Sequence, residues 1–452
     1  MPLHSHEQNP PAPRRKPVLG ETEGLIVVVA AAVVAGALGG LVGAGFRLAL
    51  HWAAAHRETA LLWLKHRPAW GWVVTIVSGA LLAGLARWMV GRFAPAAEGS
   101  GIPAVEGIVR REDAPDPLVV LPVKFIAGGM AIGGGLALGR EGPTVRMAAV
   151  IGGALGKLLH LRPSDVRVLV AAGAGAGLAV AFSAPLAGAI FVLEEIEQRF
   201  DFRVAAASFG ATAASMVVLQ TLLGFRAELA VPGLTAPPLL SLPLFAAFGL
   251  VAGTAGVFYN RLTVSGLNAA DRIGHLSTTT KAALIGGAVG VVAWFAPSLA
   301  GNGDALLHRI VNGGLAIGAI AVIFVVRFVL GPVSYSARTP GGLFWPLLVV
   351  GAALGNGFGV LSATAFPVLG LDPRAFAVVG MGTFFAAIVG APITGAALIV
   401  EMTGGHSLLI AMLVSFAGAI PMPMLWRSPP VYEALYERRA RRLKAIATGA
   451  ER

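Results

Sequence analysis

A long run without a charged residue, Gly24–Phe46, most strongly limits what this chain can fold into. The run is long enough to cross the hydrocarbon core of a bilayer as a helix, and its end is expected near Arg47 to His56. Comparable apolar segments recur along the whole length, so a single membrane anchor does not describe the sequence. Charged residues make up only 13% of the chain, against about 25% in soluble domains. We therefore predict an all-α polytopic membrane protein.

Much of the net charge of +11 lies in the two tails, in Arg14–Lys16 and in Arg438–Lys444. Basic segments beside membrane spans mark the cytoplasmic side. Both termini are therefore expected to be cytoplasmic, and no nucleic-acid partner is expected. The chain has no cysteine, which excludes disulfides and Cys-ligated metals. No His-Glu-x-x-His motif or nucleophile cluster is present either, so we expect no enzyme activity, no metal site and no cofactor.

The chain contains an internal duplication. Ala184–Glu194 aligns with Ala391–Glu401 at a displacement of 207 residues, and Gly139–Pro143 aligns with Gly342–Pro346 at a displacement of 203. The chain is therefore divided into four parts. These are a cytoplasmic tail (1–22), a first membrane repeat (23–228), a second membrane repeat (229–429), and a C-terminal helix with a basic cytoplasmic tail (430–452).

Three glycine-rich breaks share one Gly-x-x-x-Pro spacing: Gly99–Pro103, Gly139–Pro143 and Gly342–Pro346. Glycine lets the backbone break, and proline suits the first turn of a new helix. The free N–H groups of such a helix start favour an anion, and broken helices at matching points of two repeats indicate a transporter's binding site. The nearby Ser100 adds a neutral donor and no run of basic residues is close, which favours a small monovalent anion.

Glu141 lies at one of these helix starts, inside an otherwise apolar part of the chain. An ionisable residue in such a place is a functional hypothesis by default. Its carboxylate can occupy the anion site itself, and a buried carboxyl group takes up a proton more readily than one in water. Protonation would then release the side chain and admit an anion. The alternative is an interfacial glutamate that pairs with Arg140.

The three breaks resemble the three anion-site motifs of the CLC family of chloride channels and chloride/proton antiporters. Further segments also resemble family sequences: Phe182–Gly188, Glu194–Glu195, Gly390–Gly395, Glu401–Thr403 and Pro430–Tyr432. The resemblance covers roughly residues 24–445, and the segments follow the family's order. It implies a homodimer in the cell (inner) membrane, with one anion pathway per subunit. Each pathway would be built from two inverted repeats of tilted and broken helices.

The resemblance also implies roles for single residues. Glu141 would be the gating carboxylate and external proton acceptor, Glu195 the internal proton acceptor, and Lys124 a basic residue beside the pathway. Ser100 and Tyr432 would coordinate the anion through their hydroxyl groups. The other residues that the motifs assign to anion binding are Gly101, Ile102, Arg140, Gly142, Leu343 and Phe344.

These features favour a chloride/proton antiporter whose partners are chloride, protons and the lipid bilayer. A passive gated chloride channel on the same fold is the first alternative, and Glu195 argues against it because a channel needs no internal proton acceptor. An exchanger for nitrate or fluoride is the second alternative, and the intact serine motif at Ser100 argues against it. Trp345 departs from the motif, which usually has a smaller residue there. Glu194 is expected to matter more to folding than to protons.

Overall fold

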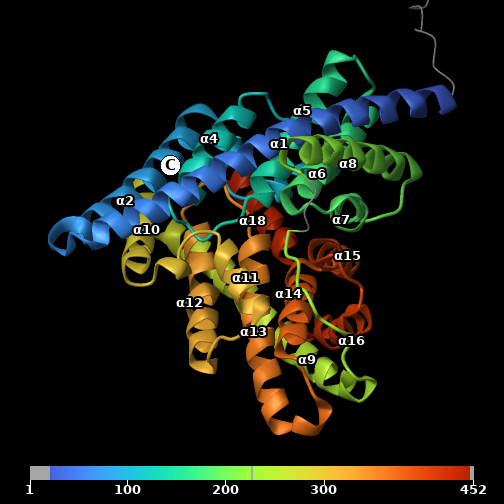
Figure 1. The fold of residues 1–452 in the computed structure, drawn as a ribbon. Helices are drawn as coiled ribbons and strands as arrows, with labels where there is room; N and C mark the ends of the chain where they lie inside the picture. Colours follow the sequence, from blue (N-terminus) through green and yellow to red (C-terminus); the bar gives the residue numbers. More distant parts are fainter. Residues whose placement is uncertain (1–20, 225–227, 448–452) are drawn as a thin grey trace, which may run out of the picture.

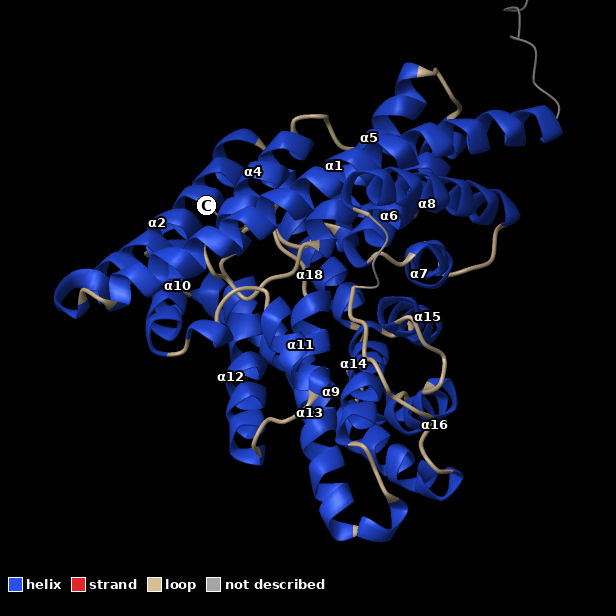
Figure 2. Cartoon of the chain, in the orientation of Figure 1, coloured by secondary structure: helices blue, strands red, loops and turns tan. Residues whose placement is uncertain are grey.

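The computed structural model describes residues 21–224 and 228–447, and within these residues helices and loops make up the fold (Figure 2). The helices of the first half are α1 (Glu21–Lys65), α2 (Pro68–Phe93), α3 (Ile102–Val109), α4 (Val120–Gly133), α5 (Glu141–Leu158), α6 (Pro163–Phe182), α7 (Pro185–Phe191), which continues as the π-helical turn η2 (Val192–Ile196), and α8 (Phe202–Leu223). Those of the second half are α9 (Leu242–Arg272), α10 (Thr278–Phe295), α11 (Asp304–Asn312), α12 (Ile317–Tyr335), α13 (Phe344–Ala365), α14 (Pro373–Val389), α15 (Pro392–Thr403), α16 (Leu409–Ala419), α17 (Pro421–Leu425) and α18 (Val431–Ala447). Single 3₁₀ turns are η1 (Pro95–Ala97), η3 (Leu239–Ser241), η4 (Pro297–Leu299) and η5 (Pro367–Leu369).

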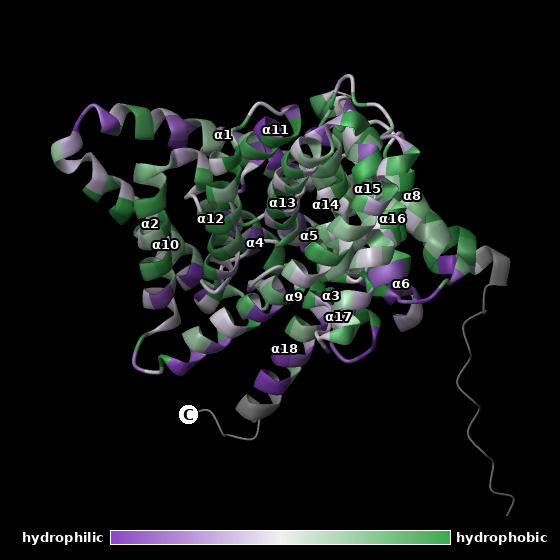
Figure 3. Ribbon diagram, turned by 90° about the horizontal axis from the view of Figure 1, so that it is seen from below, coloured by the Kyte–Doolittle hydropathy of each residue, from purple (hydrophilic) through white to green (hydrophobic). Residues whose placement is uncertain are grey.

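The surface of the molecule is that of a multi-pass membrane protein. Eight helices of the described residues are long and apolar enough to cross a bilayer. Large apolar side chains such as Trp52, Leu81 and Val325 are exposed on them, and Figure 3 shows hydrophobic residues over most helices, with hydrophilic turns on α18. Apolar surface of this extent is unfavourable in water and is accounted for by lipid.

Helix α1 is longer than the sequence predicts. It begins inside the expected tail (1–22), most of which lies outside the described residues, and it continues past Arg47 without a break. Its 45 residues span about 68 Å, more than twice the hydrocarbon core of about 30 Å. Arg47 does not end the helix because its guanidinium group is satisfied inside the protein, by the carbonyl of Val180 at 2.9 Å and by Glu228 at 2.6 Å.

The packing of the two halves confirms the duplication. Gly152 on α5 lies against the carbonyl of Leu169 on α6, and the equivalent contact in the second half joins Gly355 on α13 to Phe376 on α14. The two contacts are related by the displacements found in the sequence, since Gly152 and Gly355 differ by 203 residues and Leu169 and Phe376 by 207. A side chain at either glycine would collide with that carbonyl, so glycine permits the close helix contact. The first half occupies the upper part of Figure 1 and the second half the lower part.

Helices α7 and α15 lie side by side (Figure 1), and the end of each contacts the start of the other. Glu194 at the end of the α7 segment accepts a hydrogen bond from the backbone N–H of Thr394 at 2.6 Å. Glu401 at the end of α15 accepts one from the backbone N–H of Ala187 at 2.8 Å. Each half therefore caps the first turn of a helix in the other half, and this exchange shows that the two repeats are inverted.

Removing one of these caps tests its structural role. Glu194→Ala leaves first-turn N–H groups of α15 without acceptors, so the free energy of unfolding should fall by about 1–2 kcal/mol. The control is Glu437→Ala, because the exposed Glu437 pairs with the exposed Arg441 and such pairs contribute about 0–1 kcal/mol. Thermal unfolding in detergent measures both variants. Equal unfolding midpoints for the two would contradict the capping role.

Candidate anion-binding site

The three glycine-rich breaks meet at the centre of the molecule. Gly139 and Gly342 form an isolated antiparallel bridge, with N–H to carbonyl distances of 2.8 and 2.7 Å in the two directions. The neighbouring Gly341 donates its N–H to the carbonyl of Gly99 at 3.3 Å. These contacts bring the first turns of α3, α5 and α13 to one place, although the breaks lie far apart in the sequence.

Glu141, the first residue of α5, is fully buried at this meeting point. Its Oε1 accepts hydrogen bonds from the backbone N–H of Phe344 at 2.7 Å and of Trp345 at 3.4 Å, while its Oε2 has no hydrogen-bond partner. First-turn N–H groups lack intrahelical partners and carry partial positive charge. The carboxylate therefore binds at the N-terminus of α13, where an anion is favoured. Gly342 packs so closely against it that a side chain there would collide with the carboxylate.

Two hydroxyl groups face the same region. Ser100 and Tyr432 are buried, and their side chains lie near each other. Neither hydroxyl oxygen has a hydrogen-bond partner among the described residues. Gly142 packs directly against Ser100, with space for no side chain. Buried polar groups usually have a partner, so two unpaired hydroxyls beside a helix start are suited to holding a ligand.

The remaining residues that the motifs point to surround this region. Gly101 precedes α3 in the left-handed region at φ 95°, and Ile102 is its buried first residue. Leu343 is buried directly before α13. The ring of Phe344 packs edge-on against that of Tyr432, with centroids 5.4 Å apart. These apolar neighbours keep water away from the buried polar groups and so strengthen their electrostatic interactions.

Two basic side chains lie beneath the serine motif. Lys124 is fully buried and donates to the carbonyls of Ala97 at 3.2 Å and Gly99 at 3.0 Å. Arg146 is also buried and donates to the carbonyl of Gly101 at 3.4 Å. Both groups fix the backbone around Ser100 and place positive charge near it.

The structure explains how the bulky Trp345 fits. Its ring stacks on Phe182 at 5.6 Å and 10°, and the guanidinium carbon of Arg140 lies 4.8 Å from the ring centroid. Arg140 itself donates to the carbonyl of Ala181 at 2.9 Å and pairs with Glu228. The side chain therefore points into an aromatic stack while its backbone N–H faces Glu141.

Glu195 lies in η2 and is only 6% exposed. Its charged neighbours include Glu106 on α3, Arg110 and Glu433 on α18. Both carboxylate oxygens of Glu106 are buried without a partner. Tyr432 lies within electrostatic range of both Glu195 and Glu141.

Sequence reasoning did not find Tyr335, Arg146, Glu228 or Glu106. Tyr335 accepts a hydrogen bond from the backbone N–H of Ser100 at 3.3 Å, and Glu228 holds Arg140. Tyr335 and Glu228 lie in segments without a motif. Arg146 and Glu106 each lie three residues beyond the proline of a break, where the Gly-x-x-x-Pro spacing itself assigns no role. Within the described ranges no three metal-binding side chains lie together.

Comparison with known proteins yields several matches. Residues 79–422 match the family model described as voltage gated chloride channel. The H(+)/Cl(-) exchange transporter ClcA of Vibrio cholerae serotype O1 is 37% identical over 424 residues, covering 90% of this chain and 88% of that protein. ClcA of Cronobacter sakazakii is 36% identical over 349 residues, covering 76% and 74%.

Solved structures agree with these matches. A slow cyanobacterial Cl-/H+ antiporter superimposes with a TM-score of 0.86 at 31% identity, covering 91% of this chain and 97% of that one. A CLC-type fluoride/proton antiporter superimposes with a TM-score of 0.77 at 20% identity, covering 92% and 99%. The second match is a likeness of fold.

Proposed function

This chain belongs to the voltage-gated chloride channel family, and we propose that it exchanges chloride for protons across the membrane. One observation carries the proposal. The carboxylate of Glu141 binds the backbone N–H groups at the start of α13, beside the unpaired hydroxyls of Ser100 and Tyr432. A chloride ion and a carboxylate compete for such donors, because both are anions stabilised by a helix N-terminus.

The competition couples the two ions. While Glu141 is ionised, its carboxylate fills the anion site. A proton removes the charge that holds it there, so the side chain leaves and chloride takes its place. Glu195 supplies the second proton acceptor, since a proton crossing apolar protein needs a titratable group on its route. Lys124 holds the serine motif from below by its contact with Gly99.

The coordination of the central anion is assigned to neutral donors. Ser100 and Tyr432 contribute hydroxyls, and Phe344 contributes its backbone N–H. The backbone around these donors is shaped by Gly101, Ile102, Gly142 and Leu343. Arg140 lies next to this region, where it forms an ion pair with Glu228. Neutral donors bind a monovalent anion strongly enough to admit it and weakly enough to release it.

A passive chloride channel is the second candidate, because it uses the same anion site without Glu195. The burial of Glu195 at 6% exposure supports the antiporter, since a proton crossing apolar protein needs a titratable group on its route. Basic residues near both termini support a cytoplasmic location for the two ends. The family resemblance supports a homodimer in the cell membrane.

The direct test uses purified protein in liposomes. An outward chloride gradient should drive protons against their own gradient, with the pH change measured by an electrode. An ionophore that clamps the membrane potential is the control, because it removes proton movement driven by voltage alone. Chloride flux without any uphill proton movement would identify a channel instead.

Selectivity should depend on Ser100. Ser100→Pro removes both its hydroxyl and the backbone N–H that contacts Tyr335, so the ratio of chloride to nitrate affinity should change several-fold while the protein still folds. A neutral hydrogen bond contributes about 0.5–1.5 kcal/mol. Calorimetric titration with each anion measures the ratio, and Ser100→Ala separates the hydroxyl from the backbone effect. An unchanged ratio in both variants would remove Ser100 from the site.

A further inference from the structure

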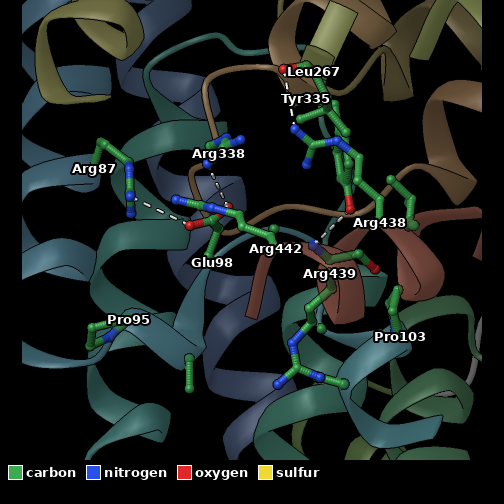
Figure 4. A pocket seen from close by; sticks show the side chains of 16 residues that line it. Arg87, Pro95, Glu98, Pro103, Leu267, Tyr335, Arg338, Arg438, Arg439 and Arg442 are labelled. Carbon is green, nitrogen blue, oxygen red and sulfur yellow. Dashed lines mark hydrogen bonds and ion pairs between the residues drawn. The ribbon is translucent and has the colours of Figure 1, made fainter. Parts of the chain in front are cut away.

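A cavity of about 380 Å³ lies beside α18 and reaches Ser100 (Figure 4). Its lining comes from α2, the loop before α3, the end of α12 and α18. Five of the lining residues are arginines: Arg87, Arg338, Arg438, Arg439 and Arg442. We call this space the arginine cavity.

One carboxylate, Glu98, faces three of these arginines. The distances between charged atoms are 3.4 Å to Arg87, 3.6 Å to Arg338 and 3.2 Å to Arg442. Arg87 is 7% exposed, and its Nε and Nη1 have no hydrogen-bond partner. A buried guanidinium group with two free donors is costly unless an acceptor comes to it.

The other two arginines have carboxylate partners of their own. Arg438 pairs with Asp271, which Arg338 also contacts, and Arg439 pairs with Asp113. Five guanidinium groups thus meet three carboxylates, which leaves an excess of two positive charges around one cavity.

The size and chemistry of the cavity indicate what it binds. Its volume lies within the range of small-molecule sites, about 300–1,000 Å³, and far exceeds the space that one chloride ion needs. Planar guanidinium forks bind phosphate oxygens through paired hydrogen bonds. Because the cavity leads inward to Ser100, a soluble anion reaches it more directly than a headgroup fixed in the bilayer.

We propose that the arginine cavity binds a soluble phosphate-bearing anion with at least two negative charges, and that the bound anion closes the chloride route on the α18 side. Its binding follows from the excess positive charge of the five arginines that line the cavity. The blocking effect rests on the proposed chloride transport, since Ser100 is among the residues that line the cavity.

Pyrophosphate is the probe for binding, titrated calorimetrically into the full chain in chloride-free detergent solution. Arg442→Gln should weaken binding about tenfold, the loss of one charge-assisted hydrogen bond, and Arg442→Lys should weaken it less. The matched control is Arg441→Gln on the same helix, because Arg441 does not line the cavity and its side chain is 76% exposed. No binding to the wild type, or equal losses in the Arg442→Gln and Arg441→Gln variants, would overturn the proposal.

Flux measurements test the blocking effect and the source of the phosphate. Pyrophosphate on the α18 side of liposomes made from neutral lipid should inhibit chloride flux, and Arg442→Gln should shift the inhibiting concentration by the same factor. Binding without inhibition would overturn the block. If chloride flux is inhibited in vesicles that contain phosphatidylglycerol but not in vesicles of neutral lipid, the cavity binds a lipid headgroup instead. Pyrophosphate binding to a protein that carries no chloride would overturn the proposed function and leave the cavity assignment standing.

Discussion

Glutamine in place of Glu141 is expected to leave chloride flux intact and to abolish coupled proton movement. The amide has nearly the shape of the carboxyl group but carries no charge and takes up no proton. A hydrogen bond to a charged group contributes about 1.5–3 kcal/mol, against about 0.5–1.5 kcal/mol for a neutral one. The side chain is therefore held less firmly at Phe344, and chloride enters the site without waiting for a proton.

The measurement is simultaneous recording of chloride and pH from one liposome preparation. Glu58→Gln is the control, because Glu58 is an exposed carboxylate on α1 and its loss should change neither flux. The coupling ratio should fall to zero in the Glu141 variant alone. Uphill proton movement by Glu141→Gln would show that another group accepts the external proton.

Glutamine in place of Glu195 should abolish coupled proton transport and leave a passive chloride flux. A positioned acid–base group contributes a factor of about 10²–10⁴ to proton transfer, so the proton flux should fall by at least about 10². Chloride should need no carboxylate on this side of the site, because its proposed ligands, Ser100 and Tyr432, are neutral hydroxyl groups. We therefore expect the two ions to use partly separate routes on the Glu195 side of the anion site.

Glu197→Gln is the matched control for this variant. It changes the same chemical group two residues away, where the carboxylate pairs with the exposed Arg199. Coupling should be unaffected in Glu197→Gln and lost in Glu195→Gln. Preserved coupling in Glu195→Gln would point to another proton route, for which Glu106 is the nearest buried carboxyl group. Absent coupling in the unmodified protein would identify a channel.

Much of the fold could be predicted from the sequence, because the duplication requires the helices of one half to have counterparts in the other. The two displacements, 203 and 207 residues, relate helix pairs in each half, and the contacts of Gly152 and Gly355 repeat accordingly. The three Gly-x-x-x-Pro breaks predicted three helix starts with free N–H groups, and the structure brings all three together. The pairing of Gly139 with Gly342 was not predictable, since period and spacing contain no information about which breaks meet.

Residues that reach the site from distant segments could not be identified from motifs or from the duplication. Tyr335 and Glu228 reach the site from segments whose sequence has no recognisable pattern. The adjacent glutamates illustrate the difference, because Glu194 turns to Thr394 whereas Glu195 turns inward. The partner of Glu194 lies 200 residues away, on a helix that no spacing in the sequence pairs with it.

The bridge between Gly139 and Gly342 has a mechanical consequence. Many carriers work by rocking one repeat against the other around a central site, and such a hinge needs the two repeats to separate near the substrate. Here backbone hydrogen bonds join the two repeats at the site itself, and the neighbouring Gly341 is hydrogen-bonded to Gly99. The two repeats therefore stay joined at the site. Opening to either side depends on side chains that move within this fixed scaffold, and not on one repeat rocking against the other.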